Sequence, residues 1–301
     1  MEQFFLQFTN GLAVGSIYAL IALGYTMVYG VLKLINFAHS DLFTLGAYLG
    51  LTLLTSLALS EHVGPFWGVV LLAVMVVGLV ALAGALLDRV AYRPLRSSPR
   101  LSAVVSALGA SIFIQNTIML IYGARFRVYP QNILPKTAIS LFGIDVPLVR
   151  ILILCASISM MVALYIFIQK TKIGTAIRAA AIDQGAARLM GIDVNRVILI
   201  VFMVGPALGG SAGLMVGLYY GQINFTMGWT YGLKAFTAAI LGGIGNIPGA
   251  MVGGILLGVI EAMGAAYISF AWKDAIAFCV LILILILRPT GLLGERVAEK
   301  V

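Results

Sequence analysis

The chain alternates long apolar runs with short polar intervals, which is the pattern of a protein that crosses a membrane many times. A spanning helix needs about 20 mostly apolar residues, and runs of about this length recur along the chain. The predicted segments are 8–32, 36–59, 65–87, 101–122, 148–168, 197–220, 225–240, 250–268 and 274–287. We therefore expect an all-α polytopic membrane protein with about eight to ten transmembrane or broken helices.

Composition supports the same class. Hydrophobic residues make up 61% of the 301 residues, charged residues make up 10%, and the mean hydropathy is +1.07, whereas soluble domains carry roughly 25% charged residues. No linker or low-complexity tract divides the chain, so residues 1–301 are predicted to form a single transmembrane domain. Cys155 and Cys279 lie inside apolar runs and are predicted to be small buried hydrophobes.

The positive charges predict an orientation. Lys and Arg concentrate in two intervals between spans, 88–100 and 169–196, and such an excess marks the cytoplasmic face. This places the N-terminus outside and the C-terminus, with Arg296 and Lys300, inside. The first apolar run lacks the positive region and cleavage site of a signal peptide, so we expect it to remain as a span. The net charge of +8 is spread over loops, and no basic aromatic stripe indicates nucleic acid binding.

The interval 169–196 is the longest polar stretch that is rich in good helix formers. Residues 175–190 are predicted to form one Ala-rich helix between Gly174 and Gly191. Small side chains let another surface approach the backbone closely, so this helix suits docking into a partner. A solvated connector is the alternative interpretation.

Two short segments form a weak internal repeat. Residues 35–37 and 223–225 are both Ile-Asn-Phe, and the following residues align without gaps. In the predicted topology the first copy starts inside and the second outside, which is the arrangement of an inverted repeat. Inverted repeats with interrupted helices are typical of transporters. The second copy is short and precedes the sequence LGGIGNIPGAMVGG, whose glycines and proline predict a helix break.

Motifs for enzyme chemistry are scarce. The sequence has no GxxxxGK[ST] loop for a nucleotide, and no HExxH motif or Cys/His cluster for a metal. Residues 209–213 fit GxSxG around Ser211, which leaves an intramembrane serine hydrolase as an alternative. Its only candidate base within an apolar run is His39, with Asp41 predicted to lie on a different helix face. Helix packing is the other interpretation of this serine.

Three runs and one interval together resemble a known family. INFAHSDLFTLGAYLG, KAFTAAILGGIGNIPGAMVGGILLG, ILRPTGLLG and the Arg-Ala-Ala interval resemble LivH-type permeases of the high-affinity branched-chain amino acid uptake systems of bacteria. The resemblance covers nearly the whole chain. It implies a multi-pass protein of the inner membrane within an ATP-binding-cassette importer for leucine, isoleucine and valine. Its implied partners are a second permease of the LivM type, two ATPase subunits that bind ATP and Mg, and an extracytoplasmic amino-acid-binding protein. The resemblance implies no cofactor in this chain.

The resemblance also implies a coupling site within 169–196. Permeases of these importers carry an EAAxxxG-like motif that docks into the ATPase, and residues 185–191 occupy that pattern with Gly185 in place of Glu. The predicted coupling residues are Arg178, Asp183, Gly185, Ala186, Ala187, Arg188 and Gly191.

The same resemblance implies a pathway for a zwitterion with an aliphatic tail. The candidate polar groups and apolar gate residues are Asn36, Phe37, His39, Asp41, Asn224 and Phe225. Each of them could instead serve helix packing or capping. Lys234 and Glu261 are expected to pair, because an unpaired charge inside a membrane is costly. An ion-coupled secondary transporter remains an alternative that would also explain the repeat and these polar groups.

Overall fold

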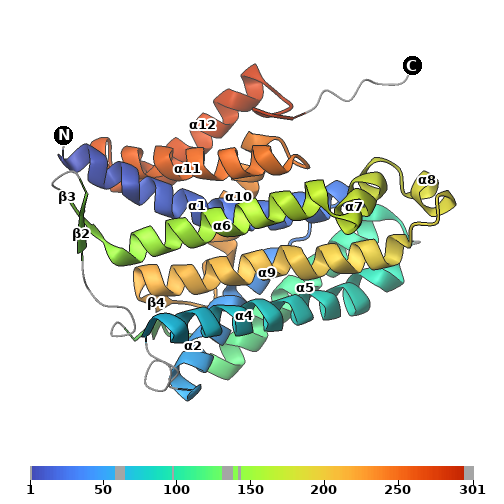
Figure 1. Ribbon diagram of the computed structural model, residues 1–301, viewed down its shortest axis with the longest axis horizontal. Helices are drawn as coiled ribbons and strands as arrows, with labels where there is room; N and C mark the ends of the chain where they lie inside the picture. The colour runs from blue at the N-terminus through green and yellow to red at the C-terminus, as the bar shows by residue number, and fades with distance from the viewer. Residues whose placement is uncertain (1, 58–64, 97, 131–137, 142–143, 295–301) are drawn as a thin grey trace.

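The computed structural model of the protein describes residues 2–57, 65–96, 98–130, 138–141 and 144–294, and most of them are helical (Figure 1). The α-helices are α1 (Glu2–Leu32), α2 (His39–Leu57), α4 (Pro65–Leu87), α5 (Arg100–Tyr122), α6 (Leu148–Lys170), α7 (Lys172–Ile182), α8 (Gln184–Leu189), α9 (Val194–Tyr220), α10 (Met227–Gly242), α11 (Ile247–Tyr267) and α12 (Lys273–Leu287). Short antiparallel strands pair β1 (Arg127–Val128) with β4 (Gln222–Ile223) and β2 (Ala138–Leu141) with β3 (Ile144–Pro147). Among the described residues, seven helices are long and apolar enough to cross a membrane, which confirms the predicted polytopic membrane class.

Helix α1 forms the centre of the bundle, beside α6, α9, α10 and α11 (Figure 1). Residues 13–28 are all buried, as expected for a helix that is hydrophobic on every side. Small residues allow its close contact with α11, since an added Cβ at Gly254 would overlap Ala19 and one at Gly258 would overlap Gly15. Such small-residue contacts bring helix backbones together where no hydrophobic force drives association.

Helix α9 packs against α1, α2 and α4 and contains Pro206. Because proline has no backbone N–H, the carbonyl of Phe202 loses its usual donor within the helix. Gly84 of α4 lies directly against that carbonyl, where an added Cβ would overlap it. The glycine therefore lets α4 cover the irregular part of α9.

The loop between α5 and α6 contains the strands β1, β2 and β3. Tyr129 anchors it, because its hydroxyl donates to the carbonyl of Ala47 in α2 and its ring lies against Gly217 of α9. Burial raises the pKa of Tyr129, so the phenol remains a protonated donor. Pro135 and Lys136 of this loop lie outside the described residues.

The loop strands and the N-terminus lie at one end of the bundle, while α7 and α8 lie at the other (Figure 1). If α7 and α8 are cytoplasmic, the N-terminus is outside, as the charges predict. Residues 58 and 59 of the second predicted span, together with Arg296 and Lys300, lie outside the described residues.

Two predictions about local structure were wrong. Cys155 and Cys279 are exposed, because they lie on faces of α6 and α12 that the other described helices do not cover. Residues 175–190 form two helices, because Asp183 leaves the helical conformation with φ −151° and ψ 112°. An apolar residue in a membrane helix can face lipid, and an Asp can cap a new helix within a helix-rich stretch.

Candidate functional site

The two copies of the internal repeat have the same local structure. In the first copy the N–H of His39 donates to the carbonyl of Asn36 at 3.2 Å, and α2 begins at His39. In the second copy the N–H of Met227 donates to the carbonyl of Asn224 at 3.3 Å, and α10 begins at Met227. Each helix therefore follows a hydrogen-bonded turn, and the two turns lie at aligned positions of the repeat. The sequence repeat thus has a structural counterpart.

These two helix starts contact each other inside the bundle. An added Cβ at Gly228 of α10 would overlap Ser40 and Thr44 of α2, and one at Gly232 would overlap Ser40. Advancing along α10 thus moves back along α2, so the helices cross in opposite directions. The start of α2 lies well inside the bundle, because the His39 ring contacts Gly24 of α1.

The three predicted polar groups of the first copy point in different directions. Asn36 is buried and accepts a hydrogen bond from the Tyr92 hydroxyl at 2.7 Å. The ring of His39 is buried between α1 and α9, with Nε2 3.1 Å from the carbonyl of Ile21. Asp41 faces α5 and accepts from Ser111 at 2.5 Å. The structure therefore does not gather these groups into one cavity, and their role in a pathway stays a prediction.

The second copy is more exposed. Asn224 uses its side chain to accept from the N–H of Thr226 at 2.9 Å, so it closes the turn before α10. Phe37 and Phe225, which occupy the same position in the two copies, are both partly buried against the core. The turn role of Asn224 is the capping alternative that the sequence also allowed.

An apolar crevice of about 680 Å³ lies between α2, α4 and α5. Leu42 and Leu45 of α2 form one wall, Leu86 of α4 a second, and Ala110 and Phe113 of α5 a third. Asp41 directly precedes Leu42 on α2 but is not among the described residues that line the crevice. The sequence did not reveal this crevice because it depends on how α5 docks.

Lys234 and Glu261 form the expected ion pair, with 2.6 Å between Nζ and Oε1. Both side chains are buried, at 7% and 8% exposure. The structure adds three groups that sequence reasoning missed: the Tyr18 hydroxyl donates to Glu261 at 2.8 Å, Asp274 lies 2.7 Å from Lys234, and Lys273 lies 3.6 Å from Glu261. The sequence signal for Lys273 and Asp274 was the presence of two charged residues at the start of an apolar run. This cluster fastens α12 to the bundle.

Ser211 does not have the surroundings of a catalytic serine. Its hydroxyl donates to the carbonyl of Leu208 at 2.7 Å within the same helix, and among the described residues it bonds no base. The GxSxG match is therefore a packing feature of α9.

The predicted coupling segment consists of α7, α8 and the turn that follows. Asp183 begins α8, and its Oδ1 accepts the N–H groups of Gly185 at 2.7 Å and Ala186 at 3.1 Å. Gly191 ends the segment with a positive φ of 80°, which favours glycine. These four positions thus shape the backbone of the segment.

Of the remaining predicted coupling residues, one attaches the segment to the bundle, one is buried and one is exposed. Arg178 donates to the carbonyl of Ile168 and so holds α7 against the end of α6. Ala187 is buried, whereas Arg188 is exposed. Gln184, which sequence reasoning missed, donates to the carbonyl of Val31 at 2.8 Å and ties α8 to the end of α1.

The tip of this segment presents apolar side chains to its surroundings. Ile182, Leu189 and Met190 are exposed by 88%, 89% and 81%. They lie at the end of the bundle that is farthest from the loop strands (Figure 1). Large apolar side chains exposed to this extent at one end of the bundle indicate an interaction site.

Comparison with known proteins agrees with the architecture. Residues 7–285 match the family model described as the permease component of branched-chain amino acid transport systems. The chain is 43% identical to the high-affinity branched-chain amino acid transport system permease protein LivH of Escherichia coli K12, over 99% of this chain and 98% of LivH. It is also 43% identical to the permease protein BraD of Pseudomonas aeruginosa, over 98% and 97% of the two chains. A probable LivH of Methanocaldococcus jannaschii is 27% identical over 91% of this chain and 88% of its own length. The chain therefore belongs to the family of permease components of branched-chain amino acid transport systems.

Proposed function

We propose that this chain is the membrane permease subunit of an importer that carries branched-chain amino acids into the cytoplasm and is driven by ATP hydrolysis on partner subunits. The observation that carries the proposal is the full-length similarity to such permeases together with the projecting α7–α8 segment. The sequence has no nucleotide-binding loop of its own, so an energy source must act through contact with other subunits.

The proposed assembly contains a second permease of the LivM type, two ATPase subunits that bind ATP and Mg, and an extracytoplasmic amino-acid-binding protein. The end with α7 and α8 faces the cytoplasm and the ATPases. The end with β1 to β4 faces outward and receives the binding protein. The second permease covers part of the apolar surface left on this chain, and lipid covers the remainder.

The transported molecule is a zwitterion with an aliphatic side chain. A pathway for it needs a few polar groups for the charged ends and an apolar wall for the tail, without a deep binding well that would slow release. The crevice between α2, α4 and α5 supplies the apolar wall, with Leu42 and Leu45 as the aliphatic surface, and Asp41, which precedes Leu42, is our candidate for a polar group. The crossing of the paired helix starts at His39 and Met227 is the element that we expect to shift between inward and outward openings.

Coupling runs through the ends of two long helices, α6 and α1. The exposed tip formed by Ile182, Leu189 and Met190 docks into a groove of the ATPase. Motion of that groove on ATP binding pulls on α6 through Arg178 and on α1 through Gln184, because these side chains fasten α7 and α8 to the bundle.

The test is copurification followed by reconstitution of the native complex. Arg188→Glu should reduce retention of the ATPases, because the substitution reverses a charge beside the docking tip. Arg125→Glu makes the same charge change on an exposed residue outside α7 and α8, and it should leave retention unchanged. Normal ATPase retention by Arg188→Glu would refute the proposed docking site. Uptake that follows an ion gradient without any ATPase would favour a secondary transporter.

A further inference from the structure

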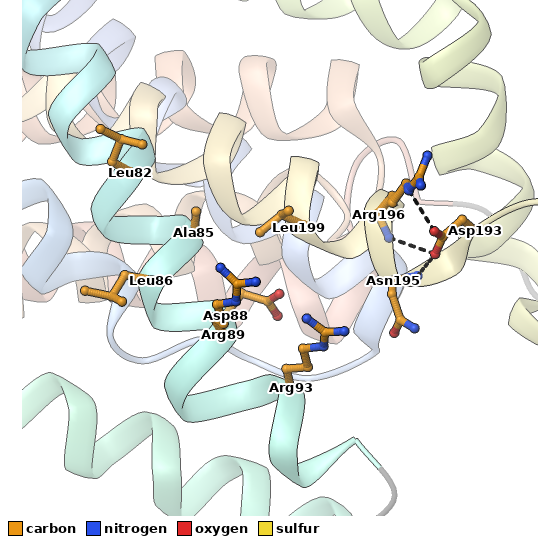
Figure 2. A pocket seen from close by; sticks show the side chains of 10 residues that line it. All are labelled: Leu82, Ala85, Leu86, Asp88, Arg89, Arg93, Asp193, Asn195, Arg196 and Leu199. Carbon is orange, nitrogen blue, oxygen red and sulfur yellow. Dashed lines mark hydrogen bonds and ion pairs between the residues drawn. The ribbon is translucent and has the colours of Figure 1, made fainter.

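A second pocket, which shares Leu86 with the crevice between α2, α4 and α5, lies between the end of α4 and the start of α9 (Figure 2). Its volume is about 500 Å³. Its walls are the last turns of α4, a π-helical turn (η1, Asp88–Tyr92), a short 3₁₀ turn (η2, Arg93–Leu95) and the first turns of α9. Since α9 directly follows α8, the pocket lies at the bundle end that carries the coupling segment.

The carboxylates of the pocket are already paired. Asp88 is buried and lies 2.5 Å from Arg96, which also donates to Asn195 at 2.5 Å. Asp193 caps α9, and its Oδ2 lies 2.9 Å from Nε of Arg196.

Two arginines of the pocket keep their charge uncompensated. Arg89 and Arg93 are exposed, and within the described part of the chain their side chains make no hydrogen bond or ion pair. They stand four residues apart, and Figure 2 shows both guanidinium groups pointing into the space between η1 and α9. A guanidinium pair in this position matches the geometry of a phosphate, which accepts bidentate hydrogen bonds.

The other end of the pocket is apolar. Leu82, Ala85 and Leu86 of α4 and Leu199 of α9 line this end, and Ala85 points toward Leu199 (Figure 2). Leu82 and Leu86 are each exposed by 62%, so this wall is open to a ligand from the bilayer. The cationic side of the pocket therefore lies at the end of the bundle, and its apolar side lies toward the middle of α4.

We propose that this pocket binds an anionic phospholipid, with its phosphate on Arg89 and Arg93 and the upper part of an acyl chain along Leu82 and Leu86. Basic pockets between transmembrane helices on the cytoplasmic side hold anionic headgroups. An acidic protein segment would satisfy the arginines but would leave the leucine wall uncovered, so the lipid is the better fit. The inference does not depend on which substrate the permease carries.

The experiment is native mass spectrometry of the full-length protein in a neutral detergent, titrated with phosphatidylglycerol or with phosphatidylcholine of identical acyl chains. We expect specific binding of phosphatidylglycerol. The double substitution Arg89→Gln/Arg93→Gln should weaken that binding roughly 25-fold, at about fivefold for each basic side chain near the surface. Lys170→Gln/Lys172→Gln removes the same charge from exposed residues at the same end and should leave the affinity unchanged.

Two further measurements separate the sources of the phosphate and guard against misfolding. Leu86→Gln should weaken phosphatidylglycerol binding without any change in charge, and inorganic phosphate at millimolar concentration should not displace the lipid. Equal binding of the two lipids, equal loss in the Lys170/Lys172 control, or displacement by inorganic phosphate would overturn the proposal. Unchanged phosphatidylglycerol affinity in the arginine variant, together with loss of a copurifying subunit, would also overturn it, because the pocket would then be a contact with another protein.

Discussion

The ion cluster of α10, α11 and α12 allows a quantitative prediction. Lys234 lies within 2.7 Å of two carboxylates, on Glu261 and Asp274, and its side chain is only 7% exposed. Lys234→Met leaves both carboxylates without this ammonium group. Removal of one partner from a buried ion pair costs about 3–5 kcal/mol. We expect a loss of about 3 kcal/mol in the free energy of unfolding, at the lower end, because Tyr18 and Lys273 still contact Glu261.

Glu261→Gln should cost less. Lys234 keeps Asp274 as a partner at 2.7 Å, and glutamine keeps the size of the side chain. We expect about 2 kcal/mol for this substitution. The double variant Lys234→Met/Glu261→Gln should lose less than the sum of the two single variants, with an interaction free energy of about 1–2 kcal/mol.

The assay is reversible unfolding of the purified chain in mixed micelles, followed by the fluorescence of its 3 tryptophans. Trp272 directly precedes Lys273, so it reports on the attachment of α12. Gly78→Ala, which meets open space on the exposed face of α4, is the control and should change stability little. Additive effects within about 0.3 kcal/mol would refute the claim that the two side chains form one energetic unit.

Three further predictions follow from contacts elsewhere in the bundle. Leu189→Asp should leave the stability of the isolated chain unchanged, because the side chain is 89% exposed. It should weaken ATPase retention at least tenfold, since burial of a leucine contributes about 1.5–3 kcal/mol. Equal retention of the ATPases in a pull-down would contradict the proposed docking tip. Gly258→Leu should prevent the contact of α11 with α1 and lower the yield of folded protein in detergent, whereas Gly78→Leu should be tolerated; equal yields would argue against close packing at this contact. Tyr92→Phe should cost about 1–3 kcal/mol, because Asn36 would lose its hydrogen-bond donor while remaining buried; an unchanged unfolding midpoint would show that the side chain repartners.

The apolar pattern of the sequence predicted the helices well because membrane spans are specified by length and composition. The observed α6 covers Leu148–Lys170 against a predicted 148–168, and α10 covers Met227–Gly242 against a predicted 225–240. The helix break was also readable, since Gly243 and Gly245 adopt positive φ values of 105° and 95° between α10 and α11.

Side-chain direction was not readable from the sequence. Asn36, His39 and Asp41 lie within six residues, but a helix start sends them to three different neighbours. The exposure of Cys155 depends on which face of α6 stays uncovered, and hydropathy does not distinguish lipid from protein. The helix break at Asp183 was not predicted, because the alanines on both sides of it have a high helix propensity.

The pairing of Lys234 with Glu261 could be inferred because isolated charges are costly in a membrane. The addition of Asp274 could not, because it requires α12 to fold back against α10. The coupling motif was visible as a pattern, whereas the attachments through Arg178 and Gln184 depend on tertiary contacts with backbone carbonyls.

We propose that this permease moves amino acids only when partner subunits supply the energy of ATP through the α7–α8 segment. The most direct measurement is concentrative uptake of labelled leucine into proteoliposomes, comparing the complete complex with this chain alone. We expect accumulation only with the complex, the binding protein outside and ATP trapped inside. Concentrative uptake by the isolated chain under an ion gradient would contradict the account.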